Sequence, residues 1–352
     1  MLIAMPDTYR VTADPVLLAA GIWLAQHRAA AGHLRASAAS ATRMGLVKVT
    51  ALEVGSSWPA ERDYRAYLAA VHLDPALASA ALALREDALR TPNERRKAGT
   101  TTSRQKGLGD GHAGWRDRLA ALDASAHTLT IVSTQAVVPD RLATEAYRAA
   151  VHRDVQASSR RQDLPADVLA RSNAYISIRA VERSLNNVHD GRTIMVDQIL
   201  ALLAFCRVGL RLRLLPATAP MPRSPCVITE YRVRLPEHQT GGRIVATSQH
   251  ADRAYYHSRA EHDTVSALIT GADQVALSTQ DSRTYLTQRL ADLRATTPTA
   301  TRGHATVAST RTMTRKQLPG GGSTPAAARL PQPAVSLAGT TGPPADPATE
   351  TR

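Results

Sequence analysis

Hydrophobic residues recur at helical spacing through the first quarter of the chain. Asp14 followed by Pro15 is typical of a helix start, and the apolar run that follows reaches a stop signal at Gly32. The same reasoning predicts four further short helices, at 34–43, 46–54, 59–73 and 75–89. Five short helices joined by tight turns predict a compact all-α unit.

A polar, basic and glycine-rich segment, Thr91–Gly114, follows this unit. It contains almost no apolar residues, which is typical of a flexible linker. Its last six residues, Gly109–Gly114, match the GxGxxG pattern of dinucleotide sites. Such a site needs a strand before the glycines, and the preceding polar residues predict none, so we interpret these as linker glycines.

Apolar periodicity returns between Trp115 and Ala295, with strand-like runs among helices. We expect helices at 115–122, 139–151, 194–205, 253–268 and 281–294, and strands at 129–132, 210–215, 226–233 and 243–247. This alternation predicts a mixed α/β domain. Residues 296–352 are rich in Thr, Ala, Pro and Gly and cannot bury enough apolar surface to offset their ordering entropy, so we expect a disordered tail.

The positions of the charged residues are more informative about function than the net charge. The chain of 352 residues has a net charge of +13, which favours a polyanionic partner, either nucleic acid or an acidic membrane surface. Between Pro15 and Leu52 the only charged residues are basic: Arg28, Arg35, Arg43 and Lys48. A solvated surface usually mixes signs, so this run indicates phosphate contact.

Two cysteines, Cys206 and Cys226, cannot form a disulfide framework or a four-thiolate zinc site, and we interpret both as core residues of a protein in a reducing compartment. Pro6 and Asp7 interrupt any secretory signal core, and the most apolar stretch, 194–215, contains charged residues. We therefore expect a soluble cytoplasmic protein with no membrane partner.

Catalytic and metal-binding signals are weak. His257 and His262, near Glu261 and Asp263, would lie on different faces of a helix, so we interpret them as a solvated helix surface. The sequence contains no serine nucleophile elbow, HExxH motif or Walker loop. We expect no enzyme activity, no metal and no cofactor.

Residues 20–55 resemble the λ-repressor-like, or Xre-type, helix-turn-helix proteins without a gap. The matching positions are Gly21, Leu24, Arg28, Ala30, Ala31 and Gly32 in the first helix, Ala39 in the second, and Lys48, Val49, Leu52, Glu53 and Gly55 at the end of the third. The pattern continues, as in actinobacterial members, through Trp58-Pro59 and Tyr67-Leu68. The chain departs from the family at the turn, where Arg43 replaces glycine and must either adopt a left-handed conformation or reshape the turn. It also departs at Leu34-Arg35, which replace Thr-Gln, and at His27, Ala38 and Thr42, which replace core leucines.

This resemblance implies that the third helix enters the major groove of double-stranded DNA. The base-facing residues would be Leu46, Val47, Lys48, Thr50 and Ala51, of which only Lys48 and Thr50 can form polar bonds with bases. The phosphate-facing residues would be Arg28, Arg35 and Arg43. An alternative stays open, in which the bundle keeps the ancestral shape but no longer binds a specific site.

The second half of the chain resembles the C-terminal domain of unknown function found in many actinobacterial Xre-type regulators. The matching residues are Pro139, Leu142, Thr144 and Tyr147, then Arg160, Arg161 and Gln162, then Met195, Gln198, Leu202, Leu214, Leu215 and Pro216, and finally Ala276, Leu277, Ser282, Arg283 and Leu286. The resemblance implies a homodimeric transcriptional regulator with a small partner protein, in an antitoxin-like (WhiJ-type) arrangement. The predicted organisation is a DNA-binding domain at 1–90, a linker at 91–114, a partner- or ligand-binding domain at 115–295, and a tail at 296–352.

Overall fold

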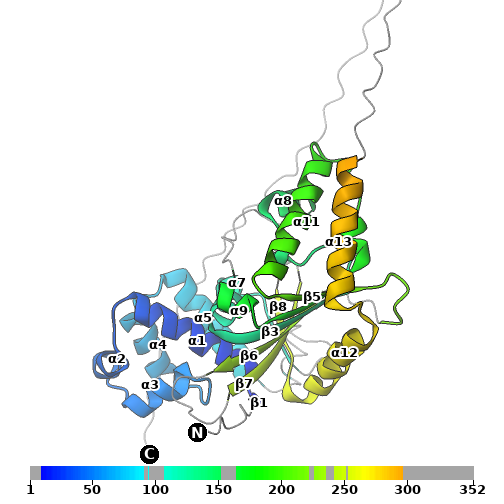
Figure 1. Ribbon diagram of the computed structural model, residues 1–352. Helices are drawn as coiled ribbons and strands as arrows, with labels where there is room; N and C mark the ends of the chain where they lie inside the picture. Colours follow the sequence, from blue (N-terminus) through cyan, green and yellow to red (C-terminus); the bar gives the residue numbers. More distant parts are fainter. Residues whose placement is uncertain are drawn as a thin grey trace, which may run out of the picture. The chain divides into compact units, whose positions relative to one another are not determined.

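The computed structural model describes residues 9–90, 94, 107–151, 164–221, 226–234, 242–250 and 253–295. The predicted tail and most of the predicted linker lie outside the described residues. Within them, a bundle of short helices is followed by a mixed α/β domain built on an eight-stranded sheet, which confirms the predicted fold class (Figure 1). No helix in the described part of the chain is long and apolar enough to cross a membrane.

The bundle consists of the five predicted helices. They are α1 (Pro15–Ala30), α2 (Arg35–Thr42), α3 (Leu46–Glu53), α4 (Glu61–Ala70) and α5 (Pro75–Leu89). The carboxylate of Asp14 accepts a hydrogen bond from the Leu17 amide at 2.9 Å, and Asp74 accepts one from the Ala76 amide at the same distance. These bonds cap helix amides that have no partner within the helix, so α1 and α5 begin where the Asp-Pro pairs predict.

The sheet joins strands from three separate parts of the chain. Its strands are β1 (Tyr9–Val11), β2 (Leu108–Asp110), β3 (Ala126–Ser133), β4 (Asn173–Ser177), β5 (Arg211–Leu215), β6 (Val227–Arg234), β7 (Gly242–Gln249) and β8 (Ala254–Tyr256). The strand order is β2-β8-β7-β6-β3-β4-β5, with β1 paired to the free part of the β7 edge. The pairs β3–β4, β4–β5 and β1–β7 are parallel, and the other pairs are antiparallel.

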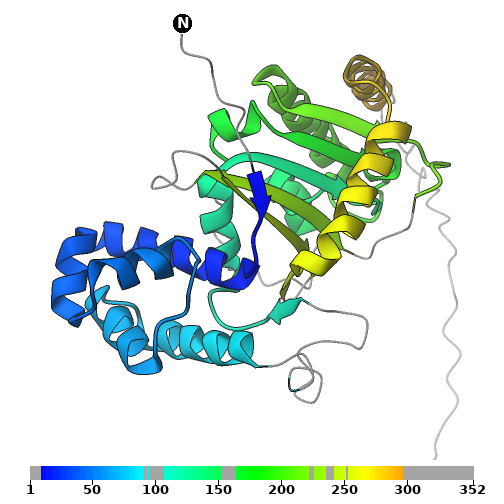
Figure 2. The same cartoon turned by 90° about the horizontal axis from the view of Figure 1, so that it is seen from below.

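Helices cover both faces of the sheet. The remaining helices are α7 (Trp115–Ser125), α8 (Glu145–Val151), α9 (Ala166–Leu169), α10 (Ile178–Glu182), α11 (Gly191–Arg207), α12 (His262–Val275) and α13 (Thr279–Ala295), with 3-10 turns η1 (Asp140–Leu142) and η2 (Arg259–Glu261). Helix α12 lies across one face, while α11 and α13 lie on the other (Figure 2). Side chains alternate accordingly along the strands: Val132 and Tyr175 pack with α12, whereas Leu129, Ile131 and Ile176 join the main core.

Three predictions for the second half of the chain are wrong in their details. The predicted helix at 253–268 begins instead as strand β8, and helix α12 starts only at His262. The end of the predicted linker forms strand β2, so Gly109 lies within a strand, and Gly111 and Gly114 lie between that strand and helix α7. His257 follows β8 rather than lying on a helix, and its Nε2 is 2.6 Å from the Ser248 hydroxyl. Both cysteines are buried, as predicted.

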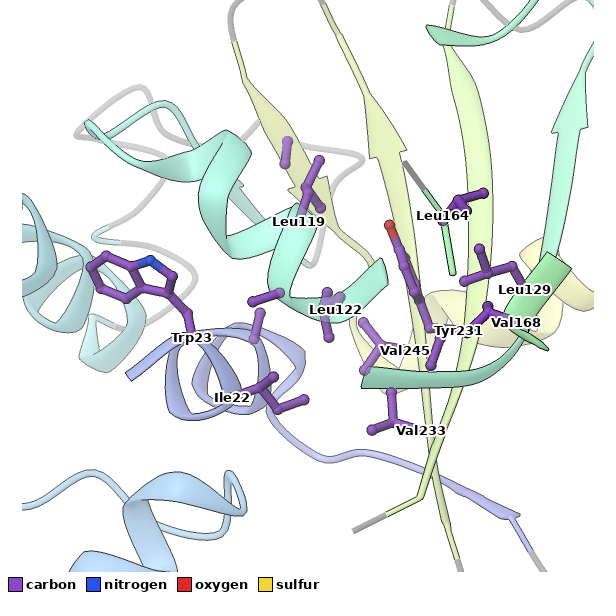
Figure 3. Close-up of a cluster of buried hydrophobic side chains, with 14 of the residues drawn as sticks. Ile22, Trp23, Leu119, Leu122, Leu129, Leu164, Val168, Tyr231, Val233 and Val245 are labelled. Atoms are coloured by element: carbon purple, nitrogen blue, oxygen red, sulfur yellow. The ribbon is translucent and has the colours of Figure 1, made fainter. Parts of the chain in front are cut away.

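Helix α1 is shared between the bundle and the α/β domain. Its first ten residues, Pro15–Leu24, are all buried. An amphipathic surface helix would expose every third or fourth residue, so α1 is enclosed on all sides. Ile22 and Trp23 lie beside Leu119 and Leu122 of α7, and the apolar cluster continues from there into the sheet (Figure 3). The two halves of the chain therefore share one continuous core.

Buried polar contacts also hold α1 in place against α7. The Arg118 guanidinium of α7 donates two hydrogen bonds to the Asp110 carboxylate of β2, each 2.8 Å long, and both side chains are fully buried. The guanidinium also lies 5.3 Å from the centre of the Trp23 ring. At the other end of the interface, Gln26 donates to the Ala121 carbonyl at 3.3 Å. Because a buried charge without its partner is costly, these contacts restrict how α1 can sit on α7.

The strand that precedes α1 belongs to the sheet. Residues Tyr9, Arg10 and Val11 pair in parallel with Gly242, Arg243 and Ile244 of β7, and the Thr12 amide donates to the Ile244 carbonyl at 3.1 Å. Three residues later α1 begins. The bundle is therefore tied to the α/β domain from both ends of the α1 segment, by β1 and by the contact with α7.

We expect Leu122→Ala to lower the free energy of unfolding by about 2–5 kcal/mol, because the substitution leaves a cavity in the shared core. Since the core is continuous, the loss should appear in one cooperative transition. Urea titrations followed by far-UV circular dichroism and by tryptophan fluorescence measure both quantities.

Leu89→Ala is the matched control, because Leu89 is 54% exposed and its truncation should change the stability by no more than about 0.5 kcal/mol. Two separate transitions in the parent chain would contradict a continuous core.

Candidate nucleic-acid interface

The turn between α2 and α3 has the geometry of a helix-turn-helix corner. Arg43 adopts the left-handed conformation, with φ 55° and ψ 20°, which is one of the two alternatives predicted for the residue that replaces glycine. The Thr42 hydroxyl donates to the Ala38 carbonyl at 2.7 Å and accepts a hydrogen bond from the Met44 amide at 3.3 Å. Thr42 thus uses its hydroxyl to close the turn, which explains how a polar residue occupies a leucine position of the related pattern.

Helix α3 presents one face outward and buries the other. Val47 is 82% exposed and Leu46 is 50% exposed, while Val49 and Leu52 are fully buried. Lys48 is exposed, and Thr50 and Ala51 are half-buried. The five residues predicted to face DNA bases therefore all lie on the accessible side of α3.

A close approach of two helices holds α3 in this position. A Cβ atom on Gly21 of α1 would lie 2.2 Å from the Leu52 carbonyl oxygen of α3, so no other residue fits there without moving the backbone. Gly55, directly after α3, has φ 66°, and a Cβ there would lie 2.5 Å from the Leu18 Cα. These two glycines press α3 and the loop after it against α1, the helix shared by both halves of the chain.

Glu53 is the electrostatic centre of the corner. Its carboxylate is fully buried and accepts hydrogen bonds from Arg28 Nε at 2.6 Å, Arg28 Nη2 at 3.0 Å, Arg35 Nε at 2.6 Å and the Tyr67 hydroxyl at 2.5 Å. Arg28 also donates to the His33 carbonyl at 2.5 Å. The cluster joins α1, α2, α3 and α4 through one carboxylate.

Two of the residues predicted to contact phosphate, Arg28 and Arg35, have a structural role in this cluster. Arg28 is only 12% exposed and Arg35 is 27% exposed, and both direct guanidinium donors at Glu53. Lys48 is partly neutralised as well, since its Nζ lies 3.1 Å from an Asp63 carboxylate oxygen. Of the four cations that make the sequence from Pro15 to Leu52 wholly basic, only Arg43 has no charged partner among the described residues.

The acidic partners were missed in the sequence because they follow the basic run. Glu53 is the first residue after it and Asp63 lies ten positions further on, and only the folded chain returns them to the cations. The one signal in the sequence was the coincidence of Arg28, Glu53 and Tyr67 at positions of the helix-turn-helix resemblance. A buried network of this kind restricts the helices to one arrangement. This structural role does not depend on any contact with DNA.

The environment of Glu53 also changes its titration. Burial raises the pKa of the Glu53 carboxyl, but the hydrogen bonds from Arg28, Tyr67 and Arg35 lower it further, so the net pKa lies below its usual value. The carboxylate is therefore the stable form in the folded protein at neutral pH.

Another buried ion pair, in addition to Arg118–Asp110, lies away from the corner. The Arg141 Nε of η1 is 2.9 Å from both carboxylate oxygens of Asp123 at the end of α7, and Arg141 donates further to the Tyr231 hydroxyl and to Gln249. The described residues contain no group of three or more His, Cys, Asp or Glu side chains that could hold a metal ion.

One family model matches the second half of the chain. Residues 116–288 match the family model described as a domain of unknown function (DUF5753). Comparison with curated proteins and with solved structures finds no match. The matched stretch runs from the start of α7 into α13, so this similarity covers most of the α/β half. Strands β1 and β2, which complete its sheet, come from outside the matched stretch.

We expect Glu53→Gln to lower the free energy of unfolding by about 3 kcal/mol at neutral pH, because it leaves two buried or half-buried guanidinium groups without a counter-charge. The wild-type ion pairs contribute fully above the unfolded-state pKa of glutamate, near 4.3, and are lost as the pH falls through the lower folded-state pKa. Urea titrations between neutral and acidic pH should therefore show a steeper acid loss in the wild type than in the variant.

Glu61→Gln is the matched control, since Glu61 is exposed and pairs only with Arg65, its neighbour on α4. Equal acid dependence in wild type and Glu53→Gln would show that the carboxylate does not hold the corner.

Proposed function

We propose that this protein is a DNA-binding transcriptional regulator that places helix α3 in the major groove. The C-terminal domain then modulates DNA binding through a small partner protein. We further propose that the active species is a cytoplasmic homodimer, because single helix-turn-helix units usually pair on two half-sites.

The observation that carries the proposal is the exposure of α3. Leu46, Val47 and Lys48 project from a helix whose opposite side is fully buried, directly after a turn with the left-handed residue that such a corner needs. Exposed apolar side chains that gather on one face mark interaction surfaces. In the major groove, Leu46 and Val47 would contact thymine methyl groups, and Lys48 and Thr50 would bond to base edges.

The three arginines predicted to contact phosphate have unequal roles in the proposed complex with DNA. Arg43 has its guanidinium available at the tip of the turn, so we assign it the main phosphate contact of the corner. Arg35 remains 27% exposed and is kept as a second phosphate contact, while Arg28 acts chiefly by holding Glu53. The affinity for DNA should then depend less steeply on salt than the basic sequence run indicates.

The shared core supports regulation through the C-terminal domain. Helix α1 supports α3 on one side and contacts α7 on the other. A partner that shifts α7 or the sheet would therefore change the support of the groove-binding helix. Coupling of this kind requires an element that both sites bias, and α1 is that element here.

The alternative is a protein-binding, antitoxin-like module whose helix-turn-helix no longer binds DNA specifically. One observation favours it: ion pairs with Glu53 and Asp63 occupy three of the four cations of the corner. A face that is more apolar than basic suits a protein partner better than a phosphate backbone. A pull-down that recovers a small protein, together with normal behaviour of a Lys48→Ala strain, would favour this alternative.

Lys48→Ala should relax sequence preference. Loss of one base contact costs about 1–3 kcal/mol at the specific site and much less on random duplex, so the ratio of the two affinities should narrow by about tenfold. Footprinting and gel-shift titrations, on fragments of the DNA upstream of the protein's own gene and on random duplex, measure the two affinities. Arg207→Ala, an exposed arginine at the end of α11, is the control and should leave the ratio unchanged.

Arg43→Ala should weaken binding to all duplexes alike. Because one phosphate contact is removed, the slope of log K against log salt should become shallower by about 0.9. Titrations at several salt concentrations give this slope. If the wild-type chain bound no fragment at low salt, regulation by DNA binding would be excluded and the protein-binding alternative would stand.

A further inference from the structure

A large cavity opens where the bundle meets the α/β domain. Its volume is about 730 Å³, and its wall includes Arg10 of β1, Arg243 of β7, Arg259 of η2 and the loop Gly55–Ser56 that follows α3. None of the three arginines forms an ion pair with any described residue. His262 and Asp263, at the start of α12, complete the charged part of the wall. Three arginines against one carboxylate make this cavity strongly positive.

Two of these arginines are held side by side by the sheet. Arg10 and Arg243 are register partners in the parallel pair β1–β7, so their side chains leave the same face of the sheet from adjacent strands. Like charges at such positions destabilise a sheet. The strands approach closely beside this pair, because a Cβ on Gly242 would lie 2.2 Å from the Tyr9 ring, so a register shift that placed another residue opposite Tyr9 would clash. An anion between the two guanidinium groups would remove this repulsion.

The chemistry of the wall selects the anion. Guanidinium groups recognise phosphate through paired N–H donors, and several arginines around one concave site are typical of phosphate binding. The volume is within the range of sites for small molecules and cofactors. We propose that this cavity binds phosphate groups, through Arg10, Arg243 and Arg259, either from a small phosphorylated molecule or from the DNA backbone.

The position of the cavity gives the binding a consequence, which rests on the function proposed above. Gly55 and Ser56 form part of the wall and directly follow α3, and their backbone amides bond to carbonyls at the end of that helix, Leu52 and Ala51. Strand β1, on the opposite part of the wall, leads directly into α1. A bound phosphate therefore touches both supports of the groove-binding helix, and its occupancy would alter the affinity for DNA.

Thermal unfolding of the full chain with pyrophosphate as the probe tests the site without DNA. We expect a saturable rise in Tm over a sodium chloride control of equal ionic strength. The double variant Arg243→Gln/Arg259→Gln should weaken the apparent Kd by about a hundredfold or more, since the loss of each charge-assisted contact weakens binding by about tenfold or more. The matched control is Arg207→Gln/Arg211→Gln, two exposed arginines outside the cavity.

Arg10→Gln provides a variant that tests the repulsion directly and does not depend on the double variant folding well. In low salt without phosphate, its Tm should equal or exceed that of the wild type, and pyrophosphate should raise it less. A clear loss of Tm on this substitution, with the pyrophosphate response retained, would overturn the assignment.

A gel-shift arm with duplex DNA separates the two sources of phosphate. Pyrophosphate stabilisation that depends on the arginines assigns the site to a small phosphorylated molecule. No pyrophosphate effect, but a loss of affinity for every duplex in the double variant, assigns it to the DNA backbone. A pyrophosphate response that is equal in wild type and double variant, or no effect in either arm, would overturn the proposal. If the wild type binds no DNA, the pyrophosphate arm still decides the site, so its failure is distinguishable from failure of the proposed function.

Discussion

The structure depends on the burial of helix α1 by both halves of the chain. Ten consecutive buried residues at its start leave no solvent face, so neither the bundle nor the α/β domain has a complete core without it. Around this helix the chain places few but costly polar contacts: Glu53 with its two arginines on the bundle side, and Arg118 with Asp110 on the sheet side. Apolar burial supplies the stability, and the buried charges restrict the arrangement, because any other packing would leave them unpaired.

The sequence predicted the helical half well, for local reasons. Asp14 and Asp74 each precede a proline, and the residues after them have helical periodicity, so the first and fifth helices could be located from neighbouring residues alone. At Arg43 the sequence left two alternatives, a left-handed residue or a reshaped turn, and the structure has the left-handed residue. Strands β1, β2 and β8 were not predicted, because three residues are too few to show alternation, and these strands form only where a distant partner provides an edge.

The candidate interface was predictable in its shape but not in its charge. Which residues of α3 point outward follows from helical spacing, and Val47, Lys48, Val49 and Leu52 lie as that spacing requires. The state of the cations depends on contacts across long separations, such as Arg28 with Glu53, which no local pattern records. A count of charges along a sequence therefore overestimates the field of a folded surface, because neutralising partners can come from any element that packs nearby.

The strand before α1 has a consequence for how such proteins can evolve. Because Tyr9–Val11 forms part of the sheet of the C-terminal half, the N-terminal bundle is inserted between two pieces of the domain it accompanies. A recombination event with a single crossover just before α7 would exchange β1 and β2 together with the bundle, so the sheet would lose its own edge strands. Chimeras between relatives should therefore keep these two strands with the sheet.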